Sequence, residues 1–189
     1  MKTISIPSAL HEVFGEEQTL GSLVGVLLAG SVGATAFYVL GADTLITAGI
    51  LRTSLALLLA FDIAAGCAAN FTRGTSDFYA RRAAKRRIFI AVHLHLPALA
   101  LLAGLPLLPS LAAWALSIAA ASIVNGRAGR ADQAATAGLL LALGLSALFL
   151  IPMPEAQLFI SLLFYIKVAY AFAVDHYLAA GSAAQGGGA

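Results

Sequence analysis

The sequence predicts an all-α integral membrane protein: a bundle of about six transmembrane helices with both termini cytoplasmic, preceded by a short interfacial amphipathic helix. Hydrophobic residues make up 60% of the 189 residues and charged residues only 11%, and the mean hydropathy is +0.91. The apolar residues form long runs, as expected for helices that each need roughly 20 residues to cross a bilayer. They do not alternate with polar residues, as the strands of a membrane barrel would.

The first 20 residues predict the interfacial helix. Acidic side chains are interleaved there with Leu10, Val13 and Phe14, and Ser8 is available as an N-cap. A six-span domain is expected over residues 21–180, and the small residues at 181–189 predict a disordered tail. The expected spans are Gly21–Leu40, Leu45–Phe71, Ile88–Leu108, Leu111–Val124, Ala134–Ile151 and Leu158–Leu178.

The fourth span is the shortest of the six. Pro106 and Pro109 interrupt helical hydrogen bonding just before it. A re-entrant or broken segment is therefore the alternative to a full crossing.

Basic residues predict the orientation. The segment after the second span carries Arg73, Arg81, Arg82, Lys85, Arg86 and Arg87, and the segment after the fourth carries Arg127 and Arg130. Short loops rich in lysine and arginine stay on the cytoplasmic side, so both termini are expected there, in a bacterial-type inner (plasma) membrane. We interpret the basic run as a topology signal that also touches lipid headgroups, and expect no nucleic-acid partner.

Asp62 is the main functional candidate because it interrupts an apolar run. On a helix Arg52, Asp62 and Asn70 share one face of the second span, and Thr72 follows at its inner end. A charge near the middle of a bilayer costs at least about 2.5 to 3.5 kcal/mol, so this face is expected to look into the protein.

The stretch HLHLP in the third span offers partners for Asp62. His93 and His95 lie at a similar depth to Asp62, on opposite sides of a regular helix. Pro97 is expected to distort that helix, because its ring clashes with the carbonyl of His93. Lys167 in the sixth span is the expected counter-ion of Asp62, and Tyr170, Asp175 and His176 lie below Lys167.

Three functions fit these residues. We favour translocation of a small solute or ion, possibly coupled to protons, through a cytoplasm-facing polar cavity with Asp62 and His93 as its core and Lys167 as charge partner. The first alternative is an intramembrane enzyme for a lipid-like substrate, with His93, His95 and Asp62 as ligands of a metal such as zinc. The second is a non-catalytic subunit, including one that binds haem through histidine. The cofactor stays unknown, and the favoured function requires none.

The remaining candidates line the expected cavity or contact substrate: Asn70, Thr72, Arg52, Tyr170, Asp175 and His176. The same cluster could instead be a satisfied polar network that only fixes helix packing. Besides the lipid bilayer, we expect either further copies of the chain or a partner membrane subunit. Six short helices enclose little interior, and the small residues Gly21, Gly25, Ala29 and Gly33 form a stripe suited to helix contact.

Overall fold

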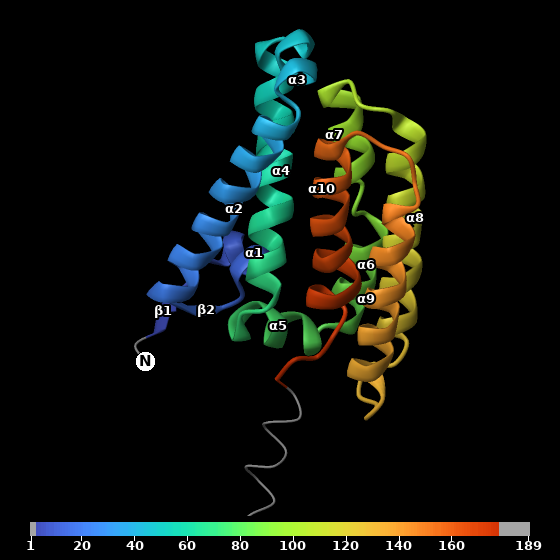
Figure 1. The fold of residues 1–189 in the computed structure, drawn as a ribbon. Helices are drawn as coiled ribbons and strands as arrows, with labels where there is room; N and C mark the ends of the chain where they lie inside the picture. The colour runs from blue at the N-terminus through green and yellow to red at the C-terminus, as the bar shows by residue number, and fades with distance from the viewer. Residues whose placement is uncertain (1–2, 178–189) are drawn as a thin grey trace, which may run out of the picture.

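The computed structural model describes residues 3–177 and is a bundle of long apolar helices (Figure 1). Its principal helices are α2 (Leu20–Leu40), α4 (Ile50–Asn70), α6 (Ala83–Ala91), α7 (His95–Ala103), α8 (Leu107–Asn125), α9 (Gln133–Phe149), α10 (Glu155–Tyr165) and the π-helix η2 (Ile166–Phe172). Within the described part, five segments are long and apolar enough to cross a membrane, with α6 and α7 counted as one, and α9 is shorter. The expected disordered tail at 181–189 lies outside the described residues.

The segment formed by α10 and η2 is the centre of the bundle. It packs against α2, α4, α8 and α9, and α2 and α4 lie on one side of it in Figure 1, with α8 and α9 on the other. Tyr165 and Phe164 are fully buried there. Gly144 on α9 lies against the Tyr165 ring, because a Cβ at this position would be 2.0 Å from Tyr165 Cζ.

The first and last described residues and the basic segments gather at one end of the bundle. Strands β1 (Thr3–Ser5) and β2 (Glu17–Thr19), α5 (Arg73–Ala80), the turn between α8 and α9, and residues 173–177 lie there. The short helix α3 (Ala42–Ala48) and the connections from α7 to α8 and from α9 to α10 lie at the opposite end (Figure 1).

The N-terminal segment is not the single amphipathic helix that we expected. It forms β1 (Thr3–Ser5) and β2 (Glu17–Thr19), which pair antiparallel, with the short helices η1 (Ser8–Leu10) and α1 (His11–Phe14) between them. Gly15 allows the reversal, since its φ is +74°. Contacts with α5 override the helical pattern: buried Gln18 donates to Thr72 Oγ1 at 2.6 Å, and the Tyr79 hydroxyl donates to the Glu12 carbonyl at 2.8 Å.

Two other expectations change in detail. The second span is divided at Gly49, whose φ of +84° lets the chain turn from α3 into α4. The fourth span is not broken: α8 is a continuous helix of 19 residues. Pro109 is its third residue, and amide groups in the first turn have no partner within the helix, so a proline is tolerated there.

Small residues let α2 and α4 approach closely, although not over the whole stripe that we expected. A Cβ at Gly33 would be 2.3 Å from Ala64 Cβ, and one at Gly30 would be 2.6 Å from the Phe61 ring. Gly21 and Gly25 have nothing within 4 Å of the corresponding position. The contact therefore follows the buried face of α2 through Gly30 and Gly33.

Candidate functional site

Asp62, Lys167 and His95 meet where α4 packs against η2 and α7. The Lys167 ammonium donates to Asp62 Oδ2 at 2.8 Å and to the Asp62 backbone carbonyl at 3.2 Å. His95 Nε2 lies 3.4 Å from the same carboxylate oxygen. The Lys167 side chain is only 3% exposed, whereas that of Asp62 is 44% exposed. The cluster is therefore an ion pair that is enclosed on the lysine side and open on the aspartate side.

Gly66 makes room for this ion pair. It lies one helical turn after Asp62 on α4, and a Cβ at this position would be 2.4 Å from Lys167 Cε and 2.7 Å from Nζ. The lysine stem therefore crosses α4 where the helix has no side chain, and the ammonium continues to Asp62.

The helix that carries Lys167 is irregular at this point. Residues Ile166–Phe172 form the π-helix η2, which directly continues α10. Asn70, at the end of α4, donates to the Lys167 carbonyl at 3.5 Å. π-Helical turns are rare and are frequent at functional sites, so η2 marks the cluster independently of its charges.

The third span breaks at His93, which confirms the distortion expected from Pro97. Helix α6 ends at Ala91 and α7 begins at His95. Because Pro97 has no amide hydrogen to donate to the His93 carbonyl, the indole Nε1 of Trp114 on α8 donates to that carbonyl instead, at 2.9 Å. Trp114 thereby stabilises the break.

The break decides which histidine reaches Asp62. His95 contacts the carboxylate, whereas His93 is 1% exposed and its Nδ1 is 2.9 Å from the Phe89 carbonyl. The His93 and His95 rings lie 4.7 Å apart between centroids. His93, expected as the direct partner of Asp62, thus lies behind His95.

Trp114→Phe is expected to lower the free energy of unfolding by about 1–3 kcal/mol, because the buried His93 carbonyl loses its donor. In the double variant Trp114→Phe/Pro97→Ala, residue 97 regains an amide that can donate to this carbonyl, so most of the loss should be recovered. Denaturant titration of the purified protein in detergent micelles measures both values. An equal loss in the single and double variants would contradict this account of the break.

The metal and haem hypotheses receive no support from the donor groups. Within residues 3–177, no three His, Cys, Asp or Glu side chains are grouped closely enough to hold a metal ion. Lys167 occupies the position beside Asp62 Oδ2 that a cation would need. His93 is enclosed among the Phe89, His95 and Phe164 rings.

The other residues expected at the site lie away from the cluster. Arg52 Nε donates to the Leu102 carbonyl of α7 at 3.1 Å. Thr72 donates to the Ala69 carbonyl at 2.7 Å, at the end of α4. His176 Nε2 is 3.0 Å from the Ala171 carbonyl, and its ring packs against Phe71 and Tyr170. Burial lowers the pKa of His176.

Asp175 forms a second buried ion pair, with Arg86. Arg86 Nη1 lies 2.5 Å from Asp175 Oδ1, and both side chains are at most 6% exposed. Arg86 Nη2 also donates to the Phe172 carbonyl at 3.0 Å, and Gln133 Oε1 accepts from the Asp175 amide at 3.2 Å. Sequence reasoning missed Arg86, because it is one of six basic residues in a run that reads as a topology signal.

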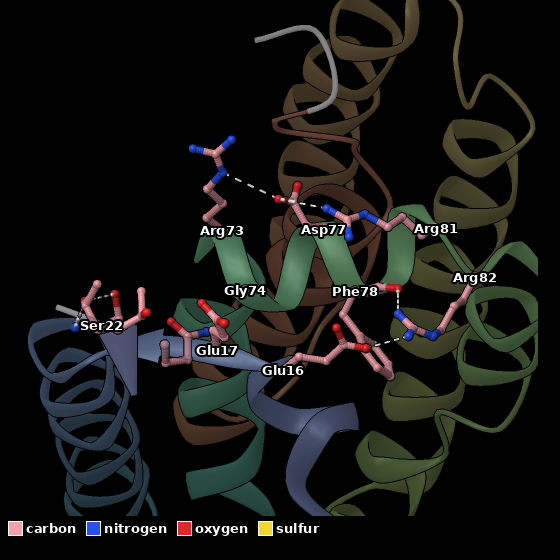
Figure 2. A pocket seen from close by; sticks show the side chains of 12 residues that line it. Glu16, Glu17, Ser22, Arg73, Gly74, Asp77, Phe78, Arg81 and Arg82 are labelled. Atoms are coloured by element: carbon pink, nitrogen blue, oxygen red, sulfur yellow. Dashed lines mark hydrogen bonds and ion pairs between the residues drawn. The ribbon is translucent and has the colours of Figure 1, made fainter. Parts of the chain in front are cut away.

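A cavity of about 420 Å³ lies between β2 and α5 at the basic end (Figure 2). It carries charges of both signs. Arg82 reaches Glu16 at 2.6 Å, while Asp77 lies 3.5 Å from Arg73 and 3.9 Å from Arg81. Of these pairs, Arg82–Glu16 joins the N-terminal segment to the end of α5, whereas the two Asp77 pairs lie within residues 73–81. The Tyr79 hydroxyl, whose pKa is raised by burial, adds a further link by donating to the Glu12 carbonyl.

The chain as a whole was also compared with known proteins. It matches no known family model, no curated protein and no solved structure.

Proposed function

We propose that this protein crosses the inner membrane with six spans, with both termini cytoplasmic, and translocates a small solute or ion coupled to proton transfer. The apolar helices support membrane insertion. The positive-inside rule supports the orientation, because the basic residues lie on α5, at the start of α6 and in the turn between α8 and α9, which are at one end of the bundle. Helix α9, which is shorter than the other candidate spans, serves as the fifth of the six.

The observation that carries this proposal is the Asp62–Lys167 ion pair with His95 beside it. Ionisable groups inside membranes are functional by default, as relays or binding groups. Both partners of Asp62 also lie in irregular helical segments. His95 follows the break at His93, and Lys167 lies in the π-helix η2. Interrupted helices near the membrane midplane are typical of transporter binding sites.

The geometry suggests how the cycle works. An entering proton competes with the Lys167 ammonium for Asp62 Oδ2, and His95, 3.4 Å from that oxygen, exchanges protons with the carboxylate. His93 extends the chain of imidazoles behind His95. Release of Lys167 from Asp62 frees η2 from α4, and this gives the cycle a second conformation.

Asp62→Asn is expected to reduce proton flux to the rate of protein-free liposomes, because the amide can neither exchange the proton nor attract Lys167 as an ion. A pH-sensitive dye inside liposomes reports this flux under imposed gradients of protons, Na⁺, K⁺ or Cl⁻. The matched control is Asp43→Asn, since Asp43 is exposed on α3. Equal flux in a folded Asp62→Asn protein would rule out the assignment.

Gly66→Ala is expected to reduce flux about ten- to hundredfold, because the new methyl group pushes the lysine stem away from Asp62. The stability loss should be about 1–3 kcal/mol, since a flexible side chain can yield. Gly25→Ala is the control, because nothing lies within 4 Å of its Cβ position. Wild-type flux in Gly66→Ala would show that the Lys167 position does not matter.

A further inference from the structure

Asp62 lies on the outward face of α4. Leu55 and Leu58, seven and four residues earlier, share its side of the helix and are 42% and 63% exposed. Ala56, Ala60 and Ile63, on the opposite side, are completely buried. The open side of the Asp62 carboxylate therefore faces the surface that the bundle presents to lipid.

The carboxylate is also far from both membrane surfaces. At 1.5 Å per residue, Asp62 lies about 18 Å from the start of α4 at Ile50 and about 12 Å from its end at Asn70. The polar headgroups lie about 15 Å from the centre of the hydrocarbon core. A phospholipid headgroup or a water-borne solute thus does not meet this opening from the side.

Apolar side chains near His95 along the chain are exposed as well. On the α7 side, Leu94 and Leu101 are 55% and 59% exposed. Arg52 closes the seam between α4 and α7 above the opening through the Leu102 carbonyl. Both Lys167 and His95 contact Oδ2 of Asp62, which leaves Oδ1 for a further hydrogen-bond donor.

We infer that the Asp62–His95 site takes an uncharged, lipid-soluble hydroxyl compound that approaches from the bilayer between α4 and α7 and donates to Asp62 Oδ1. This inference rests on the proposed function and names its substrate class. The ligand is uncharged because Lys167 already neutralises Asp62. A second copy of the chain fits less well, since a two-fold axis along the membrane normal brings equal depths together and would present another Asp62.

Photolabelling in liposomes tests this inference, with farnesol carrying a diazirine as the probe. We expect saturable labelling within α4 and α7, with unlabelled farnesol competing at least about tenfold better than its methyl ether, which has no hydroxyl to donate. Asp62→Leu should reduce labelling at least about tenfold. Asp62→Asn should keep it, because the amide group can still bond the hydroxyl, either through its oxygen as acceptor or through its NH2 group as donor. Ser31→Leu, on the exposed face of α2, is the matched control.

Three results would overturn the inference. The first is labelling spread over the outward faces of all helices and unchanged in Asp62→Leu. The second is equal competition by farnesol and the ether. The third is efficient disulfide formation between copies carrying Leu58→Cys in a Cys67→Ser background, which would show that a second chain covers the seam. Asp62→Asn separates the two proposals: retained labelling with unchanged proton flux supports the ligand site and refutes translocation, whereas lost flux without specific labelling refutes only the ligand site.

Discussion

Replacing Asp62 with leucine is expected to lower the free energy of unfolding by about 3–5 kcal/mol, the usual cost of leaving one partner of a buried ion pair alone. Lys167 is the enclosed partner, 3% exposed, and loses its main acceptor in this variant. Lys167→Met should cost less, about 1–3 kcal/mol, because the Asp62 side chain is 44% exposed and keeps the contact with His95.

The double variant Asp62→Leu/Lys167→Met should regain most of this stability, to within about 1 kcal/mol of the wild type, since apolar residues replace the pair. Denaturant titration of all four proteins in the same micelles gives the coupling energy. If the two single losses simply add in the double variant, the two side chains do not act as a pair. Proton flux should be absent from all three variants even where stability is recovered.

Much of the bundle could be predicted from the sequence, because apolar length and proline position act locally. The limits of α2, α8 and α9 lie within about four residues of the expected spans. The distortion at Pro97 was predictable as well, since it follows from a missing amide and a clash within one helical turn. The donor that replaces the missing amide, Trp114, comes from another helix and has no local signal.

Prediction of the site was weaker for the same reason. Depth along the helices could be counted, so Lys167 was expected beside Asp62, and the structure places them 2.8 Å apart. The direction in which a side chain points cannot be derived from residue spacing where the helix is broken, so His93 rather than His95 was expected to contact Asp62. A regular helix was also assumed around Lys167, because no residue pattern distinguishes the π-helix η2 from α10.

The N-terminal segment shows the opposite situation, in which a clear local pattern is overridden. Glu12 and Glu16 read as the polar face of an amphipathic helix. They instead bind Lys85 and Arg82 at 2.7 and 2.6 Å. Gly15 and Gly74 pack so closely that a Cβ at Gly15 would be 2.2 Å from the Gly74 carbonyl oxygen. Such long-range partners are absent from the helical periodicity on which the expectation rested.

Replacing Arg86 with methionine is expected to lower the free energy of unfolding by about 3–5 kcal/mol, because Asp175 would then be a buried carboxylate without its partner. The Phe172 carbonyl at the end of η2 would also lose its donor. Arg86→Lys should recover only part of the loss, since one ammonium cannot reproduce the forked contacts with Asp175 and Phe172. Denaturant titration in micelles measures each value.

Arg81→Met is the matched control, because it removes the same charge from the same basic run. Arg81 is 69% exposed and lies 3.9 Å from Asp77, so its loss should cost at most about 1 kcal/mol. The double variant Arg86→Met/Asp175→Leu should be more stable than Arg86→Met alone, because it leaves no buried charge. Similar losses of unfolding free energy in Arg86→Met and Arg81→Met would mean that the basic residues act only through their total charge. The contacts of Arg86 with Asp175 and with the Phe172 carbonyl would then not stabilise the fold.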